Sequence, residues 1–449
     1  MRNTVPTEVP IERVFLVGVE VYGNRPLLGV QDSLAELAQL ADTAGLQVVG
    51  ETYQKISKPD PHTWVGSGKL EEIRAFVEEV LADTVIFDDE LSPRHQRELE
   101  KALGEEVKVL DRTALILDIF AQHAHTREGA LQVQLAQYEY RLPRLTRQWT
   151  HLARQAGGAA GRGGTGGVGL RGPGETQLEV DRREVSNHIT HLKKELEKVR
   201  AHRQRHRAQR QRNAVPVVAI VGYTNAGKST LLNALVGTQE VLVADQLFAT
   251  LDPTTRRVGL PNRRVALFTD TVGFIQKLPT TLVAAFRATL EEISQADLLL
   301  HVVDATHPNA RQQLQAVQET LAEINSQDLP VILAFNKIDQ CQGRLPDDVA
   351  SLAEEMEGVP ISALTGLGLP ELMGKVEAEL YAKLVPIKVT LPYKAGQFIA
   401  LFHEQGIVEH TEHLEAGVLI EGRVPQRVVE RFRPYVTKSR RKKPAAQGA

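Results

Sequence analysis

The sequence GYTNAGKS at residues 222–229 decides the fold of this chain, because it stands between a short apolar run and a helix-forming run. The apolar run at 217–221 predicts a buried strand, and we expect a helix over 230–235. Glycine-rich turns of this spacing are P-loops, whose backbone N–H groups surround a phosphate at the helix N-terminus. We therefore expect Lys228 to reach the β- and γ-phosphates and the Ser229 hydroxyl to bind Mg²⁺. Alone, the pattern would also fit an ATPase.

The motif after the next predicted strand adds contacts to phosphate and metal. The strand at 265–269 runs into Asp270, Thr271, Val272 and Gly273. A carboxylate at this place lies near the magnesium ion, and the Gly273 N–H lies where a γ-phosphate oxygen would sit.

Two later motifs indicate which base is bound. Asn336 and Lys337 precede Asp339, whose carboxylate can accept hydrogen bonds from N1–H and the 2-amino group of guanine. Adenine offers neither donor, and a buried polar group left unpaired discriminates by roughly 10⁴-fold or more, so we expect GTP rather than ATP. The tripeptide Ser362–Leu364 follows a short predicted strand and can support the base through the Ala363 N–H.

The magnesium shell of such a site also needs a mobile threonine downstream of the P-loop. We favour Thr250 over Thr254 and Thr255. This threonine would hold γ-phosphate and Mg²⁺ only in the GTP state. Residues 245–258 and 271–282 are therefore predicted to be two segments that order and disorder with the nucleotide.

Many GTPases hold a glutamine after the glycine of this motif, and here Phe274 follows Gly273. A phenyl ring cannot hydrogen-bond the attacking water, so we expect slow intrinsic hydrolysis. Two substitutes stay open, a partner surface or a K⁺ ion held partly by Asn225, and they can act together.

The predicted site thus has catalytic, metal-binding and nucleotide-binding parts. The catalytic residues are Lys228, Thr250 and Gly273, and the Mg²⁺ ligands are Ser229, Thr250 and Asp270. The nucleotide contacts are expected from Gly222, Tyr223, Thr224, Asn225, Ala226, Gly227, Lys228, Ser229, Thr230, Phe248, Ala249, Thr250, Asp270, Thr271, Val272, Gly273, Asn336, Lys337, Asp339, Ser362, Ala363 and Leu364.

Length and composition describe a folded chain of several domains. Its 449 residues suggest about three units. Apolar residues make up 42% and charged residues 24%, which is typical of globular proteins and unlike disordered ones. No segment has the ~18 consecutive apolar residues that cross a bilayer. The single cysteine, Cys341, cannot form an intramolecular disulfide. We expect a cytoplasmic protein.

Alternation of strand-like and helix-like runs predicts a mixed α/β fold with four units. The first, over 1–111, is a parallel α/β domain with strands near 14–17, 48–50, 84–87 and 107–110 and helices over 33–44, 69–81 and 93–103. The others are a helical hairpin over 112–213 with a glycine-rich loop at 157–174, a P-loop GTPase domain over 214–384, and a small C-terminal α+β domain with a basic tail over 385–449.

The hairpin prediction rests on two apolar stripes at heptad spacing. Pro143 should kink or shorten the first of the two helices. The stripes are Leu131, Leu135, Tyr138, Leu142 and Leu145, and Val185, Ile189, Leu192, Leu196 and Val199.

The loop and the second helix carry most of the features that suggest a partner. Ten of the eighteen residues at 157–174 are glycine, so the free loop should be disordered and able to approach a surface closely. Between Arg182 and Arg212 there are eleven Lys or Arg and three Glu, although the net charge of the chain is −3. Such a basic helix suits the phosphates of RNA, whereas a solvated charged face is the alternative.

These motifs together resemble the HflX-type ribosome-associated GTPases of the Obg-HflX superfamily. The resemblance covers nearly the whole chain and rests on GPGETQLEVDRR at 172–183, the P-loop, FATLDPT at 248–254 and DTVGF at 270–274. It implies a GTPase that binds the 50S ribosomal subunit and its rRNA, with the hairpin and loop approaching the peptidyl-transferase region. Some members of the family split stalled or stressed ribosomes into subunits.

Two other functions stay open at this level. The chain could assemble ribosomes, or it could be a signalling GTPase at a membrane surface, using the basic residues at 438–443 on anionic lipids. A lipid surface gives no reason for a long glycine loop at a hairpin tip. A metabolic kinase lacks an acceptor-substrate motif, although the N-terminal unit could bind a second nucleotide. We expect a monomer that exchanges GTP and GDP.

Overall fold

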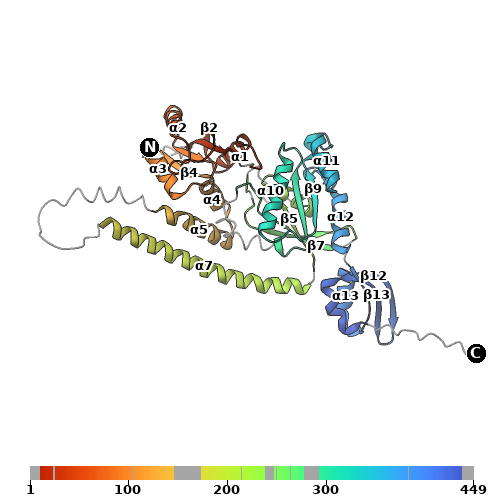
Figure 1. Cartoon of the computed structure of the whole chain (residues 1–449). Helices are drawn as coiled ribbons and strands as arrows, with labels where there is room; N and C mark the ends of the chain where they lie inside the picture. Colours follow the sequence, from red (N-terminus) through yellow and green to blue (C-terminus); the bar gives the residue numbers. More distant parts are fainter. Residues whose placement is uncertain are drawn as a thin grey trace, which may run out of the picture.

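The computed structural model of the chain contains three β-sheets in its described part (Figure 1). The structure describes residues 11–23, 26–104, 106–145, 173–213, 215–237, 247–248, 250–262, 264–277, 293–382 and 384–436. Most of the glycine-rich loop at 157–174, the basic tail at 438–443 and part of the second predicted switch segment lie outside these residues. In the described residues no helix is long and apolar enough to span a membrane.

The N-terminal unit is a parallel four-stranded sheet with helices on both faces. The strand order is β2-β1-β3-β4, and alternate residues of β1 face opposite layers. Leu16 packs in the core formed with α1 and α4, and Val17 packs in the core formed with α2 and α3. These elements are β1 (Arg13–Val21), α1 (Val30–Thr43), β2 (Gln47–Ile56), α2 (Ser67–Val80), β3 (Thr84–Phe87), α3 (Pro93–Leu103), β4 (Lys108–Asp111) and α4 (Arg112–His123). The strands and helices predicted from the sequence are all present.

The helix α4 follows the predicted domain boundary at 111 but packs on the N-terminal sheet. Its N-terminus is capped by Asp111, which accepts a hydrogen bond from the Ala114 N–H at 2.8 Å. Its apolar side chains, among them Ile116 and Phe120, are buried with those of α1. The first helix of the hairpin begins at Arg127.

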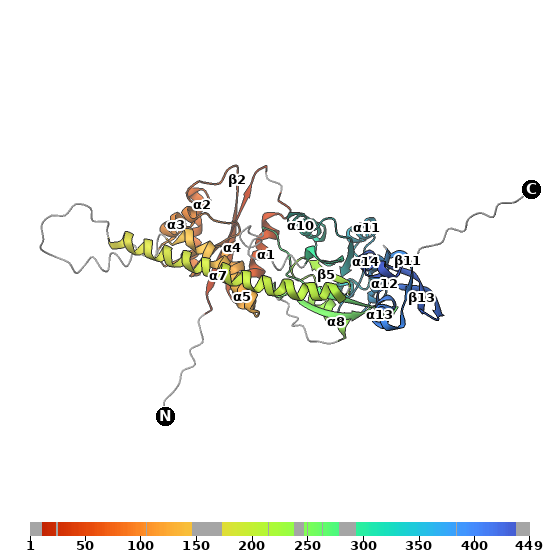
Figure 2. The same ribbon diagram turned by 90° about the horizontal axis from the view of Figure 1, so that it is seen from below.

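The hairpin consists of α5 (Arg127–Arg141), a short helix η1 (Leu142–Arg144) and α7 (Pro173–Asn213). The helix α5 ends before Pro143, as predicted, because proline cannot continue the hydrogen-bonded ladder. At about 1.5 Å per residue the 41 residues of α7 extend about 60 Å. Figures 1 and 2 show α7 running along α5 and on past the GTPase domain towards the C-terminal unit.

The apolar seam predicted between the hairpin helices is present. Its buried members are Leu135, Ile189, Leu192 and Leu196, and Leu131, Tyr138, Leu142 and Val185 pack against them half-buried. Ion pairs flank the seam, because Arg127 contacts Glu195 at 3.0 Å and Lys193 contacts Glu139 at 2.8 Å.

The GTPase domain is built on a six-stranded sheet of order β10-β9-β8-β5-β7-β6. All neighbours are parallel except β6, which pairs antiparallel with β7. Residues 254–258 of the first predicted switch segment thus belong to strand β6. The elements are β5 (Val217–Gly222), α8 (Lys228–Val236), β6 (Thr254–Gly259), β7 (Val265–Asp270), β8 (Leu298–Asp304), α10 (Ala310–Glu323), β9 (Val331–Asn336), η3 (Ile338–Cys341), α11 (Asp347–Glu355), β10 (Val359–Pro360) and α12 (Leu369–Ala382).

The N-terminal and GTPase domains share a continuous hydrophobic core. Val221 and Tyr223 at the end of β5, together with Phe274, belong to the same buried cluster as Leu34 and Ile116. The C-terminal unit has its own core. In Figure 1 the GTPase domain lies between this unit and the N-terminal sheet. It consists of β11 (Leu384–Leu391), η4 (Tyr393–Ala395), α13 (Gly396–Gln405), β12 (Ile407–Leu414), β13 (Gly417–Pro425), α14 (Gln426–Phe432) and η5 (Arg433–Tyr435), with strand order β11-β13-β12.

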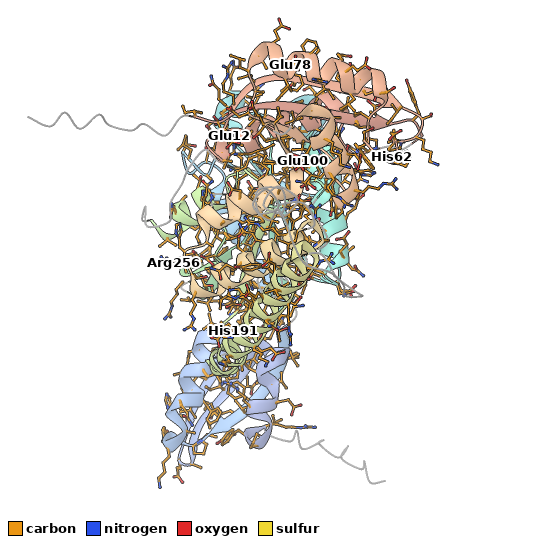
Figure 3. All side chains as sticks on the ribbon, turned by 90° about the vertical axis from the view of Figure 1, so that its left-hand side faces the viewer. Glu12, His62, Glu78, Glu100, His191 and Arg256 are labelled. Atoms are coloured by element: carbon orange, nitrogen blue, oxygen red, sulfur yellow. The ribbon has the colours of Figure 1, made fainter. Side chains whose placement is uncertain are left out.

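Figure 3 shows the side chains of these units. Glu12, Glu78 and Glu100 lie on the N-terminal domain, and His191 lies on α7 beneath it.

Candidate nucleotide-binding site

The P-loop adopts a backbone that two of its glycines permit. Gly227 has φ 91°, and a Cβ there would lie 2.3 Å from Nδ2 of Asn336. A Cβ on Gly222 would lie 2.3 Å from the Val302 carbonyl oxygen. Asn336 Nδ2 also donates to the Ala226 carbonyl at 2.9 Å. The loop is therefore fixed by the base-recognition motif and delivers the first turn of α8 to a phosphate-binding position.

Three hydroxyl and carboxylate groups converge beside the P-loop. Ser229 Oγ donates to Asp270 Oδ2 at 2.6 Å, and Thr250 Oγ1 lies 2.8 Å from Ser229 Oγ and 3.1 Å from Asp270 Oδ2. The other Asp270 oxygen, Oδ1, is buried and has no hydrogen-bond partner. Hard oxygen ligands with an uncompensated carboxylate oxygen are what Mg²⁺ prefers, so these residues fit the ion.

The other two candidate threonines take structural positions. Both Thr254 and Thr255 lie on β6, and Thr255 Oγ1 is 2.9 Å from Thr269 Oγ1 of the neighbouring strand β7. The geometry therefore favours Thr250 as the threonine of the metal site.

Lys228 is a buried cation. Its Nζ donates to the Tyr223 carbonyl at 2.7 Å, and 6% of the residue is exposed. Burial lowers the pKa of Lys228 to about 8, against the opposing effect of the Asp270 carboxylate. Burial likewise raises the pKa of Asp270, although Lys228 counteracts this. The protein thus stabilises neither the Lys228 cation nor the Asp270 carboxylate fully, so a bound phosphate and a bound metal ion would each add stabilisation.

The segment that follows β7 lies directly against the P-loop. A Cβ on Gly273 would be 2.9 Å from the Thr224 Cα and 3.1 Å from Lys228 Nζ, so only glycine allows this approach. Thr271 does not point at the site, because its Oγ1 donates to the Ile220 carbonyl at 2.7 Å, and Val272 packs half-buried against the core.

The base-recognition motifs also come together. The Ala363 N–H donates to Asn336 Oδ1 at 2.9 Å, and Ser362 Oγ donates to Asp339 Oδ1 at 2.6 Å. Lys337 has φ 70° and its Nζ contacts Asp304 at 2.7 Å. Leu364 is exposed and Thr230 is half-buried in α8.

Two predicted contact residues direct their side chains elsewhere. The Phe248 ring is buried edge-on against Phe120 of α4, with ring centroids 4.6 Å apart. The Tyr223 hydroxyl donates to Glu36 of α1. Ala249 lies outside the described residues. Asn225 is exposed in the P-loop with φ 58°.

Phe274 is part of the domain contact. Its N–H donates to the Gly222 carbonyl at 3.0 Å and its carbonyl accepts from the Thr224 N–H at 2.8 Å. The ring is 2% exposed, within the core shared with the N-terminal domain. It therefore takes up the place after Gly273 without facing the nucleotide.

The sequence did not indicate that the N-terminal sheet holds the segment after Phe274. The strand order reverses between β1 and β3, and ligands of open α/β sheets bind at such a point. Here Gln276 Nε2 donates to Ser33 Oγ at 2.7 Å, and Lys277 Nζ contacts Asp88 at 2.5 Å and Asp89 at 2.7 Å. Residues of the GTPase domain thus lie where an open sheet of this kind would bind a ligand.

A buried polar network continues from Asp88 to the P-loop. Arg112 pairs with Asp88 at 2.7 Å and with Glu36, which accepts from the Tyr223 hydroxyl. That hydroxyl accepts in turn from the Gln276 N–H at 2.9 Å. Because the partners are far apart in the chain, no local pattern could have revealed the network.

Comparison with known proteins gives the same domain order. Residues 31–121 match the family described as GTP-binding GTPase N-terminal, 123–210 match GTP-binding GTPase middle region, and 217–337 match 50S ribosome-binding GTPase. A "GTPase HflX" of Caldanaerobacter subterraneus subsp. tengcongensis is 45% identical over 90% of this chain and 90% of its own. That of Escherichia coli (strain K12) is 42% identical over 88% and 90%. The crystal structure of an SsGBP–GDP complex is 27% identical, covers 82% of this chain and 99% of its own, and has a TM-score of 0.45.

The P-loop, the magnesium-type oxygen cluster and the guanine-type motifs on a largely parallel sheet define a P-loop GTPase, an enzyme that hydrolyses GTP. The similarity to these relatives extends over about nine tenths of the chain and is not limited to the GTPase domain. The chain belongs to the HflX family of GTPases.

Proposed function

We propose that this GTPase binds the 50S ribosomal subunit through its hairpin and couples GTP binding and hydrolysis to splitting or rescue of stalled ribosomes. The observation that carries the proposal is the combination of a GTPase domain matching the 50S ribosome-binding family with a long basic helix joined to it. The protein would act in the cytoplasm as a monomer.

At the nucleotide, Lys228 binds the β- and γ-phosphates and the Gly273 N–H binds the γ-phosphate. Ser229, Thr250 and Asp270 would hold Mg²⁺, which supplies charge neutralisation for the leaving phosphate when it is bound. Asp339 orients guanine, with Ser362 fixing one of its oxygens. Phe274 cannot orient water, so turnover is slow until the ribosome, or a K⁺ ion held partly by Asn225, completes the site.

The exposed face of α7 supports RNA as the partner. Lys193, Lys194 and Lys198 are exposed on α7, outside the buried seam that contains Leu192 and Leu196. The pairs that Lys193 and Lys198 make with Glu139 and Glu195 are at the surface and are worth little, so phosphates can compete for these cations. The side chains at 202–210 lie outside the described residues.

The test is GTP turnover with and without purified 50S subunits, for the wild type and for a variant lacking residues 157–174. We expect stimulation by 50S that is reduced in the variant. Unchanged turnover with 50S would contradict the ribosomal proposal, and equal stimulation without the loop would remove its tip from the mechanism. Sedimentation of 70S ribosomes with protein and GTP separates splitting from mere binding, since only splitting yields free subunits.

A further inference from the structure

We propose that Asp252 is a positioning residue that joins Thr250 in the nucleotide site to the N-terminus of the hairpin helix α5. Through it, the ordering of Thr250 by GTP and the seating of the hairpin become one event. The inference deepens the proposed function, since it names the contact through which the nucleotide would act on the hairpin.

The contact is a carboxylate cap supplied by another domain. Asp252 Oδ2 accepts from the His125 N–H at 3.0 Å and from the Thr126 N–H at 2.7 Å, and its Oδ1 accepts from the Thr126 hydroxyl. Thr126 is itself the N-cap of α5, because its Oγ1 accepts from the Gly129 N–H at 3.0 Å. A negative charge at a helix N-terminus is favourable, because the free N–H groups and the helix dipole point at it.

The approach is so close that α5 needs a glycine in its first turn. A Cβ on Gly129 would lie 2.5 Å from Asp252 Oδ1 and 3.2 Å from Thr126 Oγ1. Glycine is unfavourable inside a helix, so its presence here has a local reason. That reason is the room it leaves for Asp252.

Little chain separates this cap from the metal site. Thr250 Oγ1 lies 2.8 Å from Ser229 Oγ, and only Leu251, whose side chain is buried, stands between Thr250 and Asp252. Pro253 restricts the backbone on the far side of Asp252. Movement of one of these two contacts therefore displaces the other.

A second set of contacts holds the chain before Thr250. The Leu247 N–H donates to Thr43 Oγ1 of α1 at 3.3 Å, and the Phe248 ring packs on Phe120 of α4. The segment around Thr250 is thus fastened to N-terminal helices on one side and to the hairpin on the other.

The consequence follows from thermodynamic reciprocity. If GTP with Mg²⁺ favours Thr250 in its present place, it favours the capped α5 to the same extent. A load that draws α5 away must then weaken GTP binding relative to GDP by the same factor. The load can arrive through α7, because the buried seam of Leu135, Ile189, Leu192 and Leu196 packs α7 on α5.

Two variants from opposite sides test the contact. Asp252→Ala removes the carboxylate, and Gly129→Ala fills its space from the hairpin without touching the nucleotide site. For each we expect the affinity for a non-hydrolysable GTP analogue with Mg²⁺ to fall about tenfold, the scale of a lost charge-assisted contact, while GDP affinity is unchanged. The double variant should be no weaker than either single one. Gly68→Ala is the matched control, because Gly68 lies in helix α2 with nothing within 4 Å of its added Cβ.

Hydrogen exchange gives a readout that a merely structural role would not move. In the wild type the GTP analogue should slow exchange of the amides of His125, Thr126 and Gly129 relative to GDP, and in Asp252→Ala it should not. A loss of GTP affinity in Asp252→Ala but not in Gly129→Ala would overturn the proposal, because Asp252 would then act at the nucleotide alone. Unchanged GTP affinity in both variants would overturn it as well. The measurements need no ribosomes, so they stand or fall independently of stimulation by 50S, and GDP affinity reports that each variant is folded.

Discussion

At the scale of single residues, the site keeps charges that the protein does not fully satisfy. Lys228 has a carbonyl as its hydrogen-bond partner, and Asp270 has one buried oxygen without any. Such groups cost free energy in the empty protein, because burial disfavours the charged form of each. Bound phosphate and Mg²⁺ remove that penalty, which concentrates binding energy on the part of the ligand that reacts.

Asp339→Asn tests the assignment of the guanine site. The amide would donate to a base that carries a carbonyl at C2, and it would lose the acceptor for the guanine 2-amino group. We expect GTP affinity to fall by roughly 10³-fold to 10⁴-fold and xanthosine triphosphate to become the better ligand. Competition binding measures both, and Asp348→Asn on the exposed side of α11 is the control. Retention of GTP preference by Asp339→Asn would show that another group reads the base.

His301 makes stability depend on pH. Burial lowers the pKa of this β8 residue to about 3, and the nearby Lys228 cation adds to the effect. The unfolded chain takes up a proton near pH 6.5 and the folded chain does not, so stability is lost as pH falls from 6.5 towards 3. The loss is about 2 kcal/mol at pH 5. Thermal midpoints between pH 7 and 5 should fall less steeply for His301→Gln than for the wild type.

The matched control for that series is His191→Gln, because His191 is exposed on α7 (Figure 3). It should leave the pH dependence of the midpoint unchanged. Equal slopes for His301→Gln and the wild type would mean that His301 is protonated in the fold.

The sequence predicted well those site residues whose roles depend on local backbone. Gly227, Gly273 and Ser229 follow from motif spacing, and each lies where that spacing requires. The sequence could not predict which side chains of these motifs contact another domain instead of the nucleotide site. Phe248 and Tyr223 belong to the same motifs, yet their rings are used by contacts with α4 and α1, which depend on how the domains pack.

At the scale of elements, the hairpin shows the same division. The heptad stripes predicted the seam of α5 and α7, because a stripe on an otherwise polar helix can be buried only by another stripe. The beginning of α5 was not predictable. It is set by Thr126 and by Asp252, a residue that the chain brings in from the GTPase domain.

The lysines of α7 predict a salt dependence of ribosome binding. Replacing Lys193, Lys194 and Lys198 by Gln removes up to three phosphate contacts. Each contact contributes about 0.7 to 0.9 to the slope of log affinity against log salt, so the slope should shrink by about 2 to 3. Binding to 50S subunits at increasing KCl concentration measures this slope.

A charge-matched triple variant controls for the loss of net charge. Lys55, Lys101 and Lys108 are exposed on the N-terminal domain and each pairs with a surface glutamate. Their replacement by Gln should leave the slope near that of the wild type. The same loss of slope in both variants would indicate a general attraction of charge instead of contacts along α7.

At the scale of the whole molecule, the N-terminal domain binds the segment of the GTPase domain that follows Phe274. Lys277 forms ion pairs with Asp88 and Asp89, which follow β3. Asp88 also pairs with Arg112 of α4. Asp88 is buried, so the loss of one of its cationic partners is costly, because its charge is then less compensated. Tyr223 connects this cluster to the P-loop, so the position of the N-terminal domain and the shape of the nucleotide site depend on one another.

Acid should separate these two domains, and Lys277→Met should make them separate at a higher pH. Burial alone would raise the pKa of Asp88, but Arg112 and then Lys277 outweigh it, and the net pKa is lowered. A carboxylate with a lowered folded-state pKa stabilises the protein above its ordinary pKa and loses that contribution as pH falls below it. Without Lys277 the folded-state pKa of Asp88 rises, so the contribution of Asp88 to stability is smaller and is lost at a higher pH.

Trp64, whose indole N–H donates to Asp89 at 3.5 Å, reports the transition by fluorescence once Trp149 is replaced by Phe. Lys55→Met, which removes a surface pair with Glu20, should leave the acid midpoint in place. An unshifted midpoint in Lys277→Met would mean that Arg112 alone keeps Asp88 charged.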